Sequence, residues 1–305
     1  MIKPLNYLVQ SQDVPEPAGY YDETKPLVIY HGNCLDGFTA AYAAWLKYPS
    51  AEFVAGVYGE QPPACEGREV YLLDFSYKEP VLASMAASAK RIVILDHHKT
   101  AQEDLNDIQS MNNVYVYFDM DKSGARLAWE YFHPGLSIPW LVRYVEDRDL
   151  WRFSMSDTKV VNAALFSWEY SFDNWTMLLR TCETAAGRVN LRAEGSAIER
   201  KQAKDIKELL AVCTQELIFC CKALPYGEVS VACANLPYTL ASDAAHTLAE
   251  GRPFGATYYQ NKAGKFIFSL RSCEDGIDVS EVAKSYGGGG HKHAAGFMVD
   301  RLEDL

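Results

Sequence analysis

The chain has 305 residues, of which 49% are hydrophobic and 23% charged, and this composition excludes a disordered or low-complexity protein. Its length is enough for two ordinary domains. The formal net charge of −11 argues against a protein that grips long duplex DNA through a broad basic face. A few local cations and a metal ion can still hold a phosphate, because charges farther away than about 8 Å are largely screened at physiological salt.

Neither the N-terminus nor the cysteines indicate an exported protein. Residues 1–17 have no uninterrupted apolar core and no small-residue cleavage pattern, so we expect no signal peptide. No apolar stretch approaches the length of a membrane span. The 8 cysteines form no CxxC pair, which favours reduced thiols over a structural zinc site. We expect a cytoplasmic protein without a membrane partner, and a homodimer is compatible with the sequence.

Short β-rich runs alternate with helical stretches in the first half of the chain. Strands are predicted at 26–32, 51–58, 68–75, 91–98 and 114–120, with helices at 37–48, 79–90 and 122–132. This alternation predicts a parallel sheet with helices on both faces.

The pattern then changes twice. A long charged helix is predicted at 190–213, and the residues beyond it form hairpin-like strand pairs with two short helices and four consecutive glycines. We therefore predict an α/β domain at 1–189, a helical linker at 190–213 and a smaller α+β domain at 214–305.

Residues that commonly bind metals follow three of the predicted strands. The first strand ends at His31 with Asp36 just beyond, another ends at Asp74, and a third ends at Asp96, His97 and His98. Ligands of open α/β sheets bind at the carboxyl ends of the strands, so these side chains are expected to meet. Carboxylates together with imidazoles suit Mn²⁺ or a similar divalent ion. One such residue alone is more often a turn residue, but three strand ends together predict a metal site.

Several motifs resemble those of the DHH phosphoesterase family, in the family's order and over essentially the whole chain. ILDHHKT resembles the family signature, HGNCLDG the first motif, LLDFS the second and VEDRDLW the fourth. GGGGHKHAAGF resembles the glycine-rich motif of the DHH-associated C-terminal domain. The family includes RecJ-like exonucleases, nano-RNA and cyclic-dinucleotide phosphodiesterases, and family II inorganic pyrophosphatases.

The resemblance implies a role for each matching residue. The implied metal ligands are His31, Asp36, Asp74, His97 and Asp147, with Asp74 bridging two ions. His98 would face the substrate as a hydrogen-bond donor or acid, and Asp96 would orient the histidines. Together with Asp36, these two residues would make up the catalytic set. The implied cofactor is one or two Mn²⁺ ions, with Mg²⁺ or Co²⁺ as alternatives.

One position departs from the family pattern. The first motif usually holds two aspartates separated by one residue, and here only the second is present, as Asp36. The earlier position is Cys34, next to Asn33. A thiolate prefers softer ions than Mn²⁺, so Cys34 is either a ligand or a bystander, and the occupancy of one metal site depends on which.

The resemblance also implies a substrate-binding set in the C-terminal domain. Glycine lets backbone N–H groups approach an anion closely, and the set comprises Arg271, Gly288, Gly289, Gly290 and His291. A glycine run alone is more often a flexible connection, and an isolated arginine more often lies at the surface.

The expected function is a divalent-metal-dependent phosphodiesterase that hydrolyses short oligonucleotides to mononucleotides. The enzyme alternatives are a cyclic dinucleotide or nucleoside bisphosphate phosphoesterase and a pyrophosphatase, although the glycine-histidine motif speaks against the last. A non-catalytic nucleotide-binding or replication-scaffold protein is the alternative from another class. The loss of metal ligands would mark such a protein, and most ligands are present here.

Overall fold

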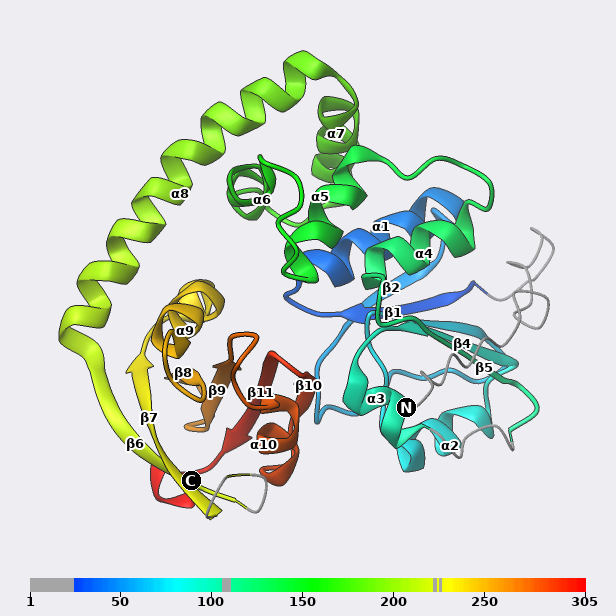
Figure 1. Cartoon of the computed structure of the whole chain (residues 1–305). Coiled ribbons are helices and arrows are strands. Elements are labelled where there is room, and N and C mark those ends of the chain that lie inside the picture. The colour runs from blue at the N-terminus through cyan, green and yellow to red at the C-terminus, as the bar shows by residue number, and fades with distance from the viewer. Residues whose placement is uncertain (1–24, 106–110, 222–223, 225–226) are drawn as a thin grey trace, which may run out of the picture. The chain divides into compact units, whose positions relative to one another are not determined.

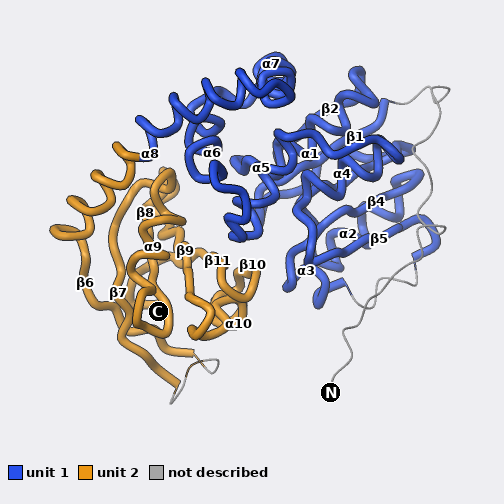
Figure 2. The backbone as a smooth tube through the Cα atoms, turned by 45° about the horizontal axis from the view of Figure 1, so that its top comes forward, with its two compact units in different colours: residues 1–199 blue, residues 200–305 orange. Residues whose placement is uncertain are grey.

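The computed structural model describes residues 25–105, 111–221, 224 and 227–305 (Figure 1). The chain divides into two compact units, residues 1–199 and residues 200–305 (Figure 2). The division lies within helix α8 (Ala185–Cys213), which begins five residues before the predicted linker helix and ends with it. The N-terminal segment without a signal-peptide pattern lies outside the described residues.

The first unit is built on a five-stranded parallel sheet with the strand order β2-β1-β3-β4-β5. Its strands are β1 (Leu27–His31), β2 (Glu52–Gly56), β3 (Glu69–Leu73), β4 (Arg91–Asp96) and β5 (Val114–Phe118). All five were predicted, and the structure confirms the parallel α/β arrangement. Each strand is shorter than predicted, because the predicted ranges included loop residues at the strand ends.

Side chains alternate between the two faces of this sheet, and each face buries a separate core. In β3, Tyr71 and Leu73 pack into one core, whereas Val70 and Leu72 pack into the other. Helices α1 (Leu35–Lys47) and α4 (Gly124–Phe132) contribute buried side chains to the first core. Helix α2 (Glu79–Ala86) contributes Leu82 and Met85 to the second. Coverage of both faces explains why side chains on both faces of the central strands are mostly apolar.

More helices pack on the first core than the sequence pattern indicated. They are α5 (Trp140–Asp149), α6 (Thr158–Phe166) and α7 (Phe172–Glu183). The short helix α3 (Lys99–Asp104) begins after His97 and His98, the two residues that follow β4. Trp175 of α7 is fully buried, and its indole N–H donates to Thr39 Oγ1 of α1 at 3.0 Å. No helix in the described part of the chain is both long enough and apolar enough to cross a membrane.

The second unit is a six-stranded sheet with the order β10-β11-β9-β8-β7-β6, in which only β7 and β8 pair in parallel. Its strands are β6 (Thr214–Cys220), β7 (Glu228–Asn235), β8 (Gly255–Gln260), β9 (Phe266–Arg271), β10 (Gly289–His291) and β11 (Ala294–Val299). The predicted hairpin-like strand pairs are present as β6 with β7 and β8 with β9, although Pro225 and Tyr226 between β6 and β7 lie outside the described residues.

Helices α9 (Ala241–Ala249) and α10 (Val279–Ser285) complete the second unit, with short 3₁₀ turns at Tyr238–Leu240 and Leu302–Asp304. Gly251 lies just beyond the end of α9 and adopts a φ of +69°, a left-handed conformation in which helices commonly end on glycine.

Candidate metal centre

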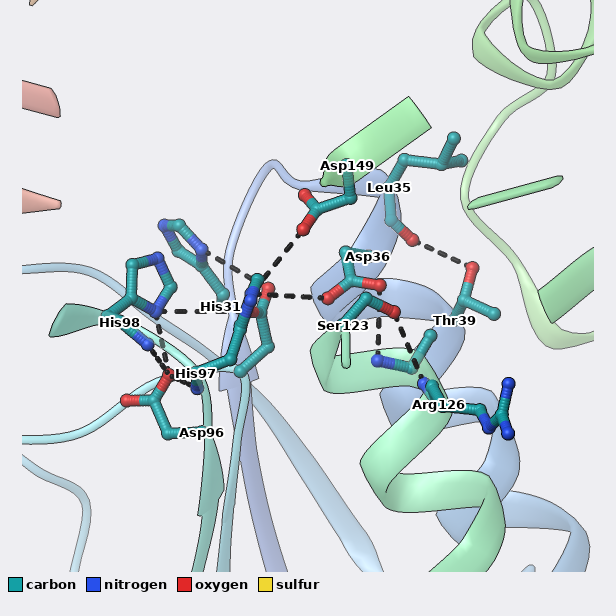
Figure 3. A network of polar contacts seen from close by, with 12 residues as sticks. His31, Leu35, Asp36, Thr39, Asp96, His97, His98, Ser123, Arg126 and Asp149 are labelled. Atoms are coloured by element: carbon teal, nitrogen blue, oxygen red, sulfur yellow. Dashed lines mark hydrogen bonds and ion pairs between the residues drawn. The ribbon is translucent and has the colours of Figure 1, made fainter. Parts of the chain in front are cut away.

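Parallel strand ends bring four of the predicted ligands together, and Figure 3 labels three of them, His31, Asp36 and His97. His31 is the last residue of β1, Asp74 directly follows β3, and His97 directly follows β4. Asp36 lies in the first turn of α1, the helix that follows β1. All four side chains gather at one edge of the sheet, as the sequence pattern predicted.

Asp74 lies between two imidazoles. Its Oδ1 is 3.1 Å from His97 Nε2, and its Oδ2 is 3.4 Å from His31 Nδ1. The residue is 1% exposed and adopts a φ of +54°, a conformation that a non-glycine residue keeps only when its surroundings enforce it. Its backbone N–H donates to Leu95 O at 2.9 Å and so holds the chain in this turn. Each carboxylate oxygen therefore faces a different histidine.

Asp36 presents one engaged oxygen and one unengaged oxygen. Its Oδ1 accepts a hydrogen bond from Ala125 N, at the start of α4, at 3.1 Å. Its Oδ2 is buried, lies 3.8 Å from His97 Nε2 and has no hydrogen-bond partner within the described residues. A buried carboxylate oxygen without a donor is costly unless a cation satisfies it.

Gly124 makes this close packing sterically feasible. A Cβ atom at this position would lie 2.3 Å from Asp74 Cβ and 2.9 Å from Asp36 Oδ2. Any side chain at the start of α4 would therefore displace two of the proposed ligands. Gly124 lies within the helix predicted at 122–132, but the sequence pattern did not reveal this role.

The fourth motif contributes Asp149 to the cluster, not Asp147. Asp149 Oδ2 lies 3.4 Å from His97 Nε2, and the Asp149 side chain is 27% exposed. Asp36, His97 and Asp149 form a group whose potential ligand atoms lie within 4.8 Å of one another. Another such group comprises His31, Asp74 and His98.

Asp147 is instead saturated by hydrogen bonds from the turn and helix that follow. Its Oδ1 accepts from Ser154 N at 2.9 Å and Ser154 Oγ at 2.5 Å, and its Oδ2 accepts from Met155 N at 3.2 Å and from Thr158 Oγ1. The predicted ligand role of Asp147 therefore needs correction. Positions two residues apart on a helix point about 200° apart, so only one of the two aspartates of α5 can face the cluster.

Asp96 holds the turn that carries the two histidines. Its Oδ1 accepts hydrogen bonds from His97 N at 2.7 Å and His98 N at 3.2 Å, and it lies 2.7 Å from His98 Nδ1. This contact engages Nδ1 of His98 and fixes the direction of its ring. Burial opposes a charge on His98, but the Asp96 carboxylate outweighs burial and raises the pKa of His98 above its ordinary value.

The carboxylates crowded around His97 favour the protonated forms of His97 and Asp36. Burial opposes a charge on its imidazole, but the hydrogen bond with Asp74 and the nearby Asp149 and Asp36 carboxylates raise the pKa of His97 to about 10. Burial and the Asp149 and Asp74 carboxylates hold the pKa of Asp36 well above its usual range. Burial also disfavours a charged Asp74, but hydrogen bonds with His31 and His97 lower its pKa. Protons on His97 and Asp36 compensate the negative charge of these carboxylates, and a divalent cation could compensate the same charge.

Cys34 lies next to this cluster at the start of α1 and is half-buried. Burial raises the pKa of its thiol well above the ordinary value, and the Asp74, Asp149 and Asp36 carboxylates add to the effect. A protonated thiol is a poor metal ligand. Cys34 is in neither of the two groups described above, so its role as a ligand stays a prediction.

The donor set fits a divalent ion. Carboxylates and imidazoles converge in two adjoining groups, one oxygen of Asp36 is buried without a donor, and Asp74 has an oxygen toward each group. Such mixed oxygen and nitrogen donors suit Mn²⁺ and related ions, while Mg²⁺ prefers oxygen alone.

The substrate-binding residues predicted from the C-terminal motif lie in the second unit. Arg271 ends β9 and donates to Ser242 Oγ at 2.7 Å and to Leu270 O at 2.8 Å. His291 ends β10, and Gly289 and Gly290 are part of that strand, so the glycine run is partly a β-strand and not a plain loop.

Close β-pairing explains two of these glycines. A Cβ on Gly288 would lie 2.1 Å from Gly296 O, and one on Gly290, whose φ is +141°, would lie 2.5 Å from Ala294 O. These positions therefore need glycine whether or not a phosphate binds there.

Comparison with known proteins identifies the C-terminal part of the chain and its overall fold. The DHHA1 domain family matches residues 239–305. An uncharacterized protein of Acanthamoeba polyphaga mimivirus is 27% identical over 326 residues, which cover 97% of this chain and 72% of the relative.

Among solved structures, the DHH domain of a protein described as a member of a ribosomal protein family matches with a TM-score of 0.60 and 14% identity, over 90% of this chain and 83% of that one. RecJ from Thermus thermophilus in complex with Mn²⁺ matches with a TM-score of 0.47 and 15% identity, over 90% of this chain and 50% of that one. Only the first likeness is close enough to define the fold. The chain therefore has the fold of this solved DHH domain, and its residues 239–305 match the DHHA1 domain family.

Proposed function

We propose that this protein is a divalent-metal-dependent phosphodiesterase that hydrolyses short oligonucleotides to mononucleotides. The observation that carries the proposal is the buried Asp36 Oδ2, which has no donor within the described residues and lies among His97, Asp149 and Asp74. A cation is the simplest group that would satisfy this oxygen and compensate the crowded carboxylates. The DHH fold and the DHHA1 domain support the assignment to phosphoester chemistry.

Five residues would hold the metal ions, and Mn²⁺ suits their donor atoms best. Asp36, His97 and Asp149 would form one site, His31 would contribute to the other, and Asp74 would contribute an oxygen to each. When bound, the ions would supply a nucleophilic hydroxide from water at neutral pH and neutralise charge on the phosphoryl oxygens.

The protein's own groups would manage protons and orientation. His98 is oriented through Nδ1 by Asp96, so its Nε2 is the atom that would donate to a phosphoryl oxygen or to the leaving alkoxide. The Asp96 carboxylate raises the pKa of His98 and so favours the imidazolium form that this role requires. Asp96 is a positioning residue, because its Oδ1 contacts the two histidines' backbone and the His98 ring.

We further propose that Arg271 and His291 of the DHHA1 domain bind a phosphate of the substrate remote from the scissile bond. Arg271 offers a guanidinium held by Ser242, and His291 follows the glycine-rich strand β10. Binding energy from such remote groups can position the scissile phosphate and raise the rate.

The experiment is a substrate panel with Mn²⁺. We expect mononucleotide release from 5′-phosphorylated RNA and DNA of two to five nucleotides to exceed hydrolysis of cyclic dinucleotides, nucleoside bisphosphates and pyrophosphate. Preference for one of the latter substrates would reassign the substrate class but retain the metal chemistry. Nucleotide binding without turnover of any substrate would instead identify a non-catalytic nucleotide-binding protein.

A further inference from the structure

The turn that follows α5 has an unusual backbone. Trp151 adopts a φ of +54° and Phe153 a φ of +48°. For bulky side chains this left-handed conformation is a genuine outlier, and glycine or asparagine adopts it far more readily. A turn that served only to reverse the chain would be more stable with those residues. Two aromatic rings at such positions indicate that the rings themselves are needed there.

Asp147 holds this turn in place. Its backbone carbonyl accepts hydrogen bonds from Arg152 N at 2.9 Å and Phe153 N at 3.3 Å, while its carboxylate binds Ser154, Met155 and Thr158. The Arg152 guanidinium also donates to Asp121 O at 2.7 Å. Hydrogen bonds therefore hold the backbone of this turn in its left-handed conformation.

The side chains of the turn combine aromatic surface with positive charge. The Trp151 and Phe153 rings meet edge to face, with centroids 5.0 Å apart. The Arg148 guanidinium lies 4.2 Å from the Trp151 ring centroid, and Lys159 Nζ lies 5.2 Å from that of Phe153. Both rings are only half-buried. Two cations therefore lie over the two aromatic rings of this turn, although the chain as a whole has a net charge of −11.

This group lies next to the metal centre along the chain, because Trp151 is two residues beyond Asp149 and Arg148 directly precedes that aspartate. A similar pair, Trp140 with Arg188 at 4.3 Å, occurs at the other end of α5. That end is about 15 Å away along the helix. Trp140 is not among the residues with positive φ. The backbone strain and the neighbouring Asp149 thus distinguish Trp151 from Trp140.

We propose that the Trp151 platform, consisting of Trp151, Phe153 and Arg148, stacks against a nucleobase of the substrate and places the adjoining phosphate at the metal centre. Aromatic rings bind bases of any sequence because every base has a π-face, and a neighbouring arginine adds attraction for the phosphate. The platform deepens the proposed function and rests on it. It assigns base recognition without sequence preference to the catalytic unit itself.

The test compares equilibrium binding of adenosine 5′-monophosphate and ribose 5-phosphate to the full chain by calorimetry. Trp151→Asn removes the ring and tolerates the left-handed backbone, so thermal unfolding should show an intact fold. We expect this variant to lose about ten- to one-hundred-fold in affinity for adenosine 5′-monophosphate, with ribose 5-phosphate unchanged. Trp151→Phe should retain most of the affinity. Trp140→Asn, the matched control, should bind both ligands like the wild type.

The platform would be overturned if Trp151→Asn bound adenosine 5′-monophosphate as tightly as the wild type does, or if it lost affinity equally for both ligands. It would also be overturned if the wild type showed no preference for adenosine 5′-monophosphate over ribose 5-phosphate. Mononucleotide release from a dinucleotide, measured on the same proteins, separates this proposal from the proposed function. Hydrolysis that is unaffected in Trp151→Asn would refute the platform alone. A base-dependent loss of binding in a protein that hydrolyses no phosphodiester would retain the platform and refute the enzyme.

Discussion

We expect Asp147→Ala to lower the stability of the fold and Asp149→Ala to lower the affinity for metal. Asp147 accepts four hydrogen bonds from Ser154, Met155 and Thr158, whereas Asp149 is exposed and faces His97. A hydrogen bond to a charged group contributes about 1.5–3 kcal/mol, but the freed hydroxyls and amides of Asp147→Ala can partly bind water. We therefore expect Asp147→Ala to cost about 3 kcal/mol in total.

That cost corresponds to a fall in Tm of roughly 6–12 °C for a unit of this size. Asp149→Ala, an exposed substitution, should change the Tm of the metal-free protein by no more than about 2 °C. Its affinity for Mn²⁺ should fall at least about tenfold, because even residues outside the ligand set typically cost that much.

The Tm difference between wild type and Asp147→Ala should depend on pH, because folding lowers the pKa of Asp147. Burial opposes ionisation of Asp147, but the hydrogen bonds from Ser154 and Thr158 outweigh it and lower the pKa of the carboxyl. A lowered folded-state pKa stabilises the protein above the unfolded-state value of about 4. The Tm difference between wild type and Asp147→Ala should therefore shrink as the pH falls below that value.

Differential scanning fluorimetry and Mn²⁺ titration calorimetry at about 20 °C measure both effects on the same samples. The reasoning would be refuted by an Asp149→Ala protein that binds Mn²⁺ like the wild type while folded Asp147→Ala has lost binding. In that case Asp147 would be the ligand, as the sequence motif alone suggested.

Three further predictions concern single positions. Gly124→Ala should reduce both Mn²⁺ affinity and turnover at least about tenfold, because its Cβ would displace Asp74 and Asp36. A Gly124→Ala protein that binds Mn²⁺ as tightly as the wild type in calorimetry would contradict the packing of Gly124 against these ligands. Cys34→Asp should retain or improve Mn²⁺-supported activity and enlarge the rise in Tm on adding Mn²⁺. Cys34→Ser should change little in either measurement. A folded but inactive Cys34→Asp protein with less bound metal would show that the thiol sets the local geometry. His291→Ala should lose about ten- to one-hundred-fold in kcat/KM on oligonucleotides, as expected for a lost charge-assisted hydrogen bond, but much less on bis-p-nitrophenyl phosphate. Equal losses on both substrates would assign His291 to the chemical centre.

The sequence was sufficient to predict the sheet and most of the cluster. Apolar runs alternating with helical stretches defined five parallel strands, and residues at the ends of such strands must meet. His31, Asp74 and His97 could therefore be assigned without knowledge of side-chain directions, since each lies at a strand end.

The choice between Asp147 and Asp149 needed information that the motif did not contain. It depends on the rotation of α5 about its axis, and the helices between α4 and α8 were not assigned from the sequence pattern. The role of Gly124, within the helix predicted at 122–132, could not be recognised from the sequence, because it follows from the approach of Asp74 in space. The glycines before His291 were likewise expected to let backbone N–H groups approach a phosphate closely. The close approach of this segment to β11 already requires two of these glycines.

The central claim is that a divalent ion held by Asp36, Asp74, His97 and their neighbours carries the hydrolysis. The most direct measurement is mononucleotide release from a 5′-phosphorylated dinucleotide by protein stripped with EDTA and then titrated with Mn²⁺, in the wild type and in Asp74→Asn. We predict no turnover after stripping, recovery in the wild type as one or two ions bind, and no recovery in Asp74→Asn, whose fold should persist. Full turnover in excess EDTA, or a fully active Asp74→Asn protein, would contradict the metal centre.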